Sequence, residues 1–194
     1  MKNVIAVISV LLVLSLASLA GADIYRGTVV SSVTEQYNGT LVYTSDVWRF
    51  HFGLANDANV HIYTDSWTDF TSGNFDPAIY LWNGSGVLIA ESIDIDPITN
   101  YNASLQETLS AGNYTITLVL NGNIPAKADP PNPILLSDGF SFDSFAQQDL
   151  ITTFGVLGNF HVFFDVVPVP EPSTFLLFAG GLLGVGMLRK KFKA

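Results

Sequence analysis

The sequence predicts an all-β protein, an antiparallel β-sandwich with one apolar segment at each end of the chain. Apolar and polar residues alternate with a period of two in several short stretches, which is the pattern of strands with one buried face. Turn-forming sequences separate these stretches, and no long amphipathic helical pattern occurs between the two terminal segments. Together these features favour two packed sheets.

The first 22 residues have the three parts of a secretory signal peptide. Lys2 provides the positive start, residues 4–19 the apolar centre, and Ala20-Gly21-Ala22 a cleavage site of small residues. The alternative is an uncleaved membrane anchor. The signal-peptide interpretation places the start of the mature body near Asp23 and the β-sandwich domain at residues 23–167.

Alternation is clearest at residues 48–52, where Trp48, Phe50 and Phe52 share one face of a strand. Similar patterns occur at residues 60–63, 79–82, 114–120 and 160–166, all rich in β-branched and aromatic residues. Hairpin turns are predicted at Asn38-Gly39 and at Asn83-Gly84-Ser85-Gly86, with a chain break at Ala111-Gly112-Asn113.

Residues 121–154 do not follow this pattern. Four prolines, at positions 125, 130, 131 and 133, prevent a regular ladder, so residues 121–133 are predicted to form a surface loop. Residues 134–154 fit a strand, a short helix or both.

Charge is distributed unevenly along the chain. All 17 acidic residues lie between Asp23 and Glu171, whereas the two terminal segments hold most of the 8 basic residues. This acidic body argues against nucleic-acid binding, which needs a basic surface, and is compatible with divalent cations. The absence of Cys excludes disulfides, thiolate catalysis and Cys-based zinc sites.

The C-terminal segment, residues 168–194, has three parts in a fixed order. Pro170-Glu171-Pro172 interrupts regular structure, an apolar run of 14 residues with 4 Gly follows at 175–188, and the chain ends in Arg189-Lys190-Lys191-Phe192-Lys193. A membrane-spanning helix needs about 20 apolar residues, so the predicted hydrophobic helix is a marginal span whose basic end stays cytoplasmic. It is either a short permanent anchor or a temporary stop that an enzyme removes.

This order of features resembles the PEP-CTERM sorting signal of Gram-negative bacteria. The resemblance implies export by the secretion machinery and processing near Pro170, Glu171 and Pro172 by an exosortase, a membrane cysteine protease. It further implies an intermediate anchored transiently in the inner membrane, and a final place in the cell envelope or extracellular matrix. It does not imply that the chain is itself an enzyme.

A second resemblance lies in the body, at roughly residues 46–120. Phe75-Asp76-Pro77, the strand that follows it, and the strand–turn–strand sequence at 104–116 resemble bacterial pre-peptidase C-terminal domains. They resemble more closely the exported proteins named for their Phe-Asp-Pro motif. The resemblance implies a jelly-roll-like β-sandwich that acts as an accessory or binding module. Those families often carry a fuller acidic pair where this chain has Asp94-Ile95-Asp96-Pro97.

Acidic residues in the predicted loops suggest a calcium site. Calcium takes six to eight oxygen ligands, and Asp94 and Asp96, two positions apart in an extended segment, would point the same way. Asp76 is a further candidate ligand. The alternatives are a solvated acidic loop and, for Asp76, a turn in which its carboxylate bonds a backbone N–H.

No pattern of catalytic residues is present, and we expect the protein not to be an enzyme. The three histidines stand singly in predicted strands, and no G-x-S-x-G elbow occurs. Trp67 and Trp82 are candidate glycan contacts, with filling of the core as the alternative. The sequence thus predicts a non-enzymatic surface or matrix protein linked to exopolysaccharide and biofilm. A polysaccharide-binding module with structural calcium comes second, and a surface hydrolase third.

Overall fold

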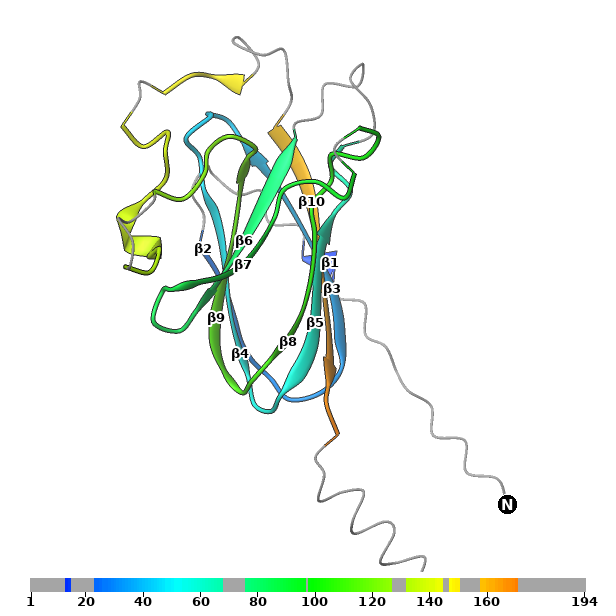
Figure 1. The fold of residues 1–194 in the computed structure, drawn as a ribbon. Helices are drawn as coiled ribbons and strands as arrows, with labels where there is room; N and C mark the ends of the chain where they lie inside the picture. The colour runs from blue at the N-terminus through cyan, green and yellow to red at the C-terminus, as the bar shows by residue number, and fades with distance from the viewer. Residues whose placement is uncertain are drawn as a thin grey trace, which may run out of the picture.

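Two β-sheets packed face to face form the body of the protein (Figure 1). The computed structural model describes residues 13–14, 23–67, 76–96, 98–126, 132–144, 147–150 and 158–170. The elements are β1 (Val13–Leu14), β2 (Asp23–Val29), β3 (Val33–Leu41), β4 (Trp48–Leu54), β5 (Ala58–Thr64), β6 (Pro77–Asn83), β7 (Leu88–Ser92), β8 (Ser104–Leu109), β9 (Gly112–Leu120), the 3₁₀ turn η1 (Leu136–Asp138) and β10 (Gly158–Pro168). The predicted all-β sandwich is confirmed. Most of the predicted signal peptide, and all of the predicted C-terminal helix, lie outside the described residues.

Sheet A has the strand order β1-β3-β10-β5-β8, and sheet B has the order β2-β4-β9-β6-β7. Most neighbouring strands are antiparallel, as predicted, but β1 runs parallel to β3 and β2 runs parallel to β4. The parallel pair in sheet B arises because the chain leaves that sheet after β2, forms β3 in sheet A, and returns as β4. Short hairpins alone, as the sequence suggested, would have produced only antiparallel pairs.

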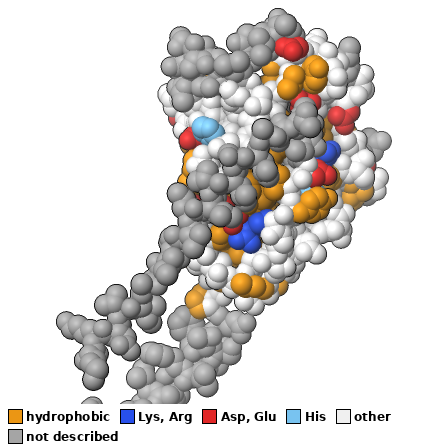
Figure 2. All heavy atoms as spheres, turned by 180° about the vertical axis from the view of Figure 1, so that it is seen from behind, with side chains coloured by type: hydrophobic (Ala, Val, Ile, Leu, Met, Phe, Trp, Pro, Cys, Tyr) orange, Lys and Arg blue, Asp and Glu red, His pale blue; other side chains and the backbone are white. Residues whose placement is uncertain are grey.

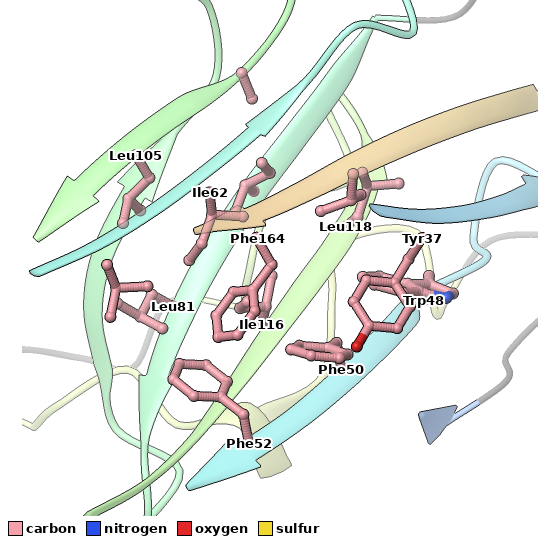
Figure 3. Packing of buried hydrophobic residues seen from close by; sticks show 14 of the residues in the cluster. Tyr37, Trp48, Phe50, Phe52, Ile62, Leu81, Leu105, Ile116, Leu118 and Phe164 are labelled. Carbon is pink, nitrogen blue, oxygen red and sulfur yellow. The ribbon is translucent and has the colours of Figure 1, made fainter. Parts of the chain in front are cut away.

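Aromatic and branched side chains from the inner faces of both sheets form the main core (Figure 3). Trp48, Phe50 and Phe52 of β4 are almost completely buried, as their alternation predicted. Across the sandwich, Phe160 contacts Trp48 edge-on with ring centres 5.4 Å apart, and Phe164 contacts Phe50 in the same way at 5.1 Å. Such pairs contribute about 0.5–1.5 kcal/mol beyond their burial, so β4 and β10 hold the two sheets together.

A second apolar cluster covers part of the outer face of sheet B. Tyr80 and Trp82 of β6 point outward but are fully buried, because Phe140 from the irregular segment 132–144 packs against both rings. Within the described part of 134–154, the structure has the turn η1, isolated bridges such as Val87–Leu135, and one helical residue, Leu150, after which the description stops. This segment therefore acts as a cover for one half of sheet B.

A partly buried ion pair joins β2 of sheet B to β3 of sheet A. Arg26 of β2 donates from Nε and Nη2 to the carboxylate of Glu35 on β3 at 2.8 and 2.7 Å, and the Tyr37 hydroxyl donates to the same carboxylate at 2.6 Å. Burial by itself would raise the pKa of Glu35, but the hydrogen bonds from Arg26 and Tyr37 outweigh it and hold that pKa below its ordinary value. The carboxylate therefore stabilises the folded state when it is charged.

Replacing Tyr37 by Phe is expected to lower the free energy of unfolding at pH 7 by about 1–3 kcal/mol, the contribution of a hydrogen bond to a charged group. Because the pKa of Glu35 is depressed in the folded state, its contribution is present above pH 4.5 and is lost as the pH falls. Denaturant unfolding at several pH values should show a weaker acid dependence in Tyr37→Phe. Tyr43→Phe, which removes a hydroxyl from a half-buried tyrosine, is the control, and an equal loss in both variants would contradict the argument.

Candidate functional site

The predicted sorting motif begins where the last strand ends. Strand β10 finishes at Pro168, the Val169 N–H donates to the Asp57 carbonyl at 2.8 Å, and Pro170 is exposed at the end of the described chain. Glu171, Pro172 and the apolar run that follows lie outside the described residues. Among the residues that the structure describes, no helix is both long and apolar enough to cross a membrane.

Two of the predicted calcium ligands lie close together at one end of sheet B. Asp76 precedes β6 and Asp94 follows β7, and these two strands are antiparallel neighbours. One Asp76 oxygen accepts a hydrogen bond from the Asn121 side chain at 2.9 Å. The Oδ1 atoms of Asp76 and Asp94 are buried without a hydrogen-bond partner among the described residues. Burial raises the pKa of Asp76 to about 6; the bond from Asn121 opposes this shift and the Asp94 carboxylate reinforces it.

Asp96 is placed differently from the other two carboxylates. Its Oδ1 accepts hydrogen bonds from the backbone N–H groups of Ile98 and Thr99, which lower the pKa of Asp96. Asp96 also bridges to Asn100 through the backbone, so the chain turns here instead of remaining extended. The prediction that Asp94 and Asp96 point the same way assumed an extended segment, and that premise does not hold.

The described oxygen donors at this end of sheet B do not by themselves complete a calcium shell. Asp76, Asp94 and Asn121 provide fewer than the six to eight oxygens that calcium takes. In the described ranges, no group of three or more Asp, Glu, His or Cys side chains could hold a metal ion. Calcium binding stays a prediction, for which Asp76 and Asp94 are the residues to test.

Asp76→Asn is expected to raise the free energy of unfolding at pH 7 by about 1–2 kcal/mol. This value is smaller than the pKa shift alone implies, because the carboxylate is only half-buried and solvent screens it. A raised pKa means that folding favours the neutral acid. The contribution of Asp76 to the free energy of unfolding is therefore fully present below pH 3.8 and is lost as the pH rises to about 6. Thermal melts of both proteins between pH 4 and 7 measure this.

The same melts with excess calcium test the metal prediction. If Asp76 is a ligand, calcium raises the melting temperature of the wild type at pH 7 and has less effect on Asp76→Asn. Asp96→Asn is the matched control, because its carboxylate is exposed and bonded within its own turn. Identical melting temperatures with calcium and with chelator would contradict the prediction of a calcium site.

The two predicted glycan contacts have different surroundings. Trp82 is fully buried, and its indole N–H donates to the Thr117 hydroxyl at 3.0 Å, so it is a core residue in this fold rather than the predicted glycan contact. The reason is the Phe140 cover, which alternation in β6 could not reveal. Trp67 is partly exposed, stands 4.8 Å from the Tyr101 ring, and has its backbone held on both sides by the Asn102 side chain. Trp67 stays a predicted glycan contact.

Each histidine lies on an outer sheet face and has a polar partner. His51 pairs with Thr115 at 2.9 Å, His61 with Ser104 at 3.0 Å and His161 with Asp65 at 2.8 Å. These contacts agree with the expectation of outward strand positions.

The contact nearest to a catalytic arrangement is Ser104–His61, with Asp165 opposite His61 in the ladder. It stands on a flat strand surface, where the N–H of Ser104 donates to the Ser92 hydroxyl. Neighbouring amides belong to the β5–β8 and β5–β10 ladders. The described residues therefore supply no oxyanion hole beside Ser104.

The half of sheet B that Phe140 does not cover contains a cleft of about 430 Å³ that the sequence did not predict. Tyr25 of β2 forms one wall, and the β6–β7 turn with Leu136 forms the opposite wall. The floor includes His51, Gly53 and Asn113 from β4 and β9. In the sequence, the cleft is indicated only by the Gly-containing turns at 83–86 and 111–113. Tyr25 could not be identified as part of it, because this residue belongs to no alternating pattern.

Three comparisons relate the chain to known proteins. Residues 168–191 match the family described as "PEP-CTERM protein-sorting motif". The chain therefore carries this sorting signal, which implies export, a membrane-anchored intermediate and processing by an exosortase. No curated protein sequence matches the chain significantly.

Solved structures give distant matches to the body. The pre-peptidase C-terminal domain of a Bacillus anthracis collagenase is 11% identical with a TM-score of 0.39, covering 77% of this chain and 98% of that one. PliG from Aeromonas hydrophila, a periplasmic inhibitor of g-type lysozyme, is 10% identical with a TM-score of 0.41, covering 75% and 99%. Likenesses this distant say nothing about ligand or activity.

Proposed function

We propose that this protein is a non-catalytic module of the cell surface or extracellular matrix that associates with exopolysaccharide after an exosortase removes its tail. The observation that carries the proposal is the position of the sorting motif directly after β10. A cut near Pro170 removes no strand of either sheet, so the processed protein keeps its whole core.

The side chains of the body support a binding role over a catalytic one. Among the described residues, none supplies an oxyanion hole beside the Ser104–His61 contact, and each histidine is engaged by a hydroxyl or carboxylate partner. Basic residues are also sparse, since the described part of the chain contains only Arg26 and Arg49. Figure 2 shows one face of the molecule, where Lys and Arg side chains appear only at isolated points. Such a surface does not favour polyanions as ligands.

The processed protein is expected to lack residues 175–194. Intact-mass spectrometry of the protein recovered from the envelope or the medium measures this directly. Replacement of Pro170, Glu171 and Pro172 by Ala should leave the tail in place and increase the membrane-bound fraction. Glu107→Ala, which changes an exposed carboxylate in β8, should be processed as wild type. Recovery of the wild-type protein with its tail intact would defeat the processing proposal.

Association with exopolysaccharide is expected to depend on the folded body. Processed wild-type protein should co-sediment with exopolysaccharide isolated from the producing cells, and heat-unfolded protein should stay in the supernatant. Wild-type protein that stays entirely in the supernatant would contradict the matrix part of the proposal, whatever the result of the mass measurement.

A further inference from the structure

Tyr25 is an aromatic platform that is held in place although it is exposed. The side chain is 74% exposed, yet its ring lies parallel to the His51 ring with centres 4.4 Å apart. His51 is fixed in turn by the hydrogen bond between its Nδ1 and the Thr115 hydroxyl. One face of the Tyr25 ring is therefore covered and the other is open, and a ligand that stacks there meets a ring that is already oriented.

Glycine keeps the floor of the cleft low. A Cβ at Gly53 would lie only 3.1 Å from the side-chain oxygens of both Asn113 and Thr28, and a Cβ at Gly84 would lie 3.1 Å from the Asn113 carbonyl. A larger residue at Gly53 would displace the Asn113 and Thr28 side chains, and one at Gly84 would press on the Asn113 backbone carbonyl. The shape of the cleft therefore depends on glycine, which has no side chain, at positions 53 and 84.

The described lining of the cleft is polar but uncharged, because no Lys, Arg, Asp or Glu is among the described residues that border it. Anionic ligands such as phosphates need basic partners, and a divalent cation needs carboxylates. A wholly apolar ligand would bury the Asn113 amide and the Thr28 hydroxyl, which have no hydrogen-bond partner among the described residues. A peptide added as an extra strand would bind along the free edge of β2 and not across the sheet face.

A neutral carbohydrate satisfies all of these constraints. Its hydroxyl groups can both donate to and accept from an amide or a hydroxyl, and the C–H face of a sugar ring can stack on a tyrosine. The span also fits a chain of sugars, since β2 and β6 are separated by β4 and β9, which makes the cleft about 14 Å wide at a strand spacing of about 4.8 Å. The volume lies within the range of small-molecule sites, about 300–1,000 Å³.

We propose that this cleft binds a short stretch of neutral polysaccharide, with one sugar stacked on Tyr25 and its neighbours hydrogen-bonded to Asn113 and Thr28. The inference rests on the proposed association with exopolysaccharide and gives it a site and a ligand class. It places glycan binding on the outer face of sheet B, away from the buried Trp82.

Isothermal titration of the processed protein tests the site. The probes are tetrasaccharides of β-1,4-linked glucose, β-1,3-linked glucose and β-1,4-linked mannose, with tetragalacturonate as an anionic comparison. Wild type should bind at least one neutral probe and bind tetragalacturonate more weakly. Tyr25→Ala and Asn113→Ala should each weaken that binding by about tenfold or more.

The matched control is Tyr63→Ala. Tyr63 also stacks on a histidine, His61 at 4.6 Å, but it stands on the outer face of sheet A. Its removal should leave the affinity unchanged. Thermal melts establish that all variants are folded, which is expected for Tyr25→Ala because the side chain is exposed.

Four outcomes would overturn the inference, and they separate it from the proposed function. Unchanged binding in Tyr25→Ala and Asn113→Ala, with loss in Trp67→Ala, would place the glycan site at Trp67 and leave the function intact. Equal or tighter binding of tetragalacturonate would reject the neutral ligand class. An equal loss in Tyr63→Ala would show that the effect is not local to the cleft. Failure of wild type to bind any neutral probe would reject the site, whereas the co-sedimentation measurement decides the function.

Discussion

The pairing of β10 with two distant strands is the constraint on which the rest of the structure depends. This last strand lies in the middle of sheet A, antiparallel to β3 on one side and β5 on the other. A side-chain hydrogen bond between Thr40 and Asn159 joins positions 119 residues apart. The inner residues of β10 also meet the aromatic side chains of β4. Sheet A and the main core are therefore complete only when the chain has been made to residue 168.

This constraint explains why a signal can follow the domain without disturbing it. The sorting motif starts at residue 168, at the end of the strand that completes the fold. One backbone hydrogen bond, from Val169 to Asp57, continues beyond β10 in the described chain. The folded body and the tail therefore have separate requirements: non-local pairing for the body, and a short apolar run with basic residues for the tail.

Alternation predicted the inner faces of β4, β5, β9 and β10 because each depends only on residues within one strand. It failed for the outer face of β6, where Phe140 arrives from a segment about sixty positions later and buries Trp82. It also failed at Asp96, where local hydrogen bonds turn the chain. The cleft was beyond sequence reasoning because its floor is defined by side chains that are missing at Gly53 and Gly84.

The two halves of sheet B show how one sheet serves both stability and binding. Its β6 half is covered by Phe140, and the buried rings there add to the core. The β2 half keeps an open cleft, in which His51 orients Tyr25 without burying it. The similar Tyr63–His61 pair on sheet A has a second stacking neighbour, because the Phe163 ring also lies parallel to Tyr63 with ring centres 4.7 Å apart. Tyr63 therefore shares its ring with two aromatic neighbours, whereas the largely exposed Tyr25 stacks on His51 and borders the cleft. Aromatic rings that are at least partly exposed occur on both outer faces of the sandwich and do not by themselves mark a binding site. The face of sheet B differs because its oriented Tyr25 ring borders the same cleft as the polar side chains of Asn113 and Thr28.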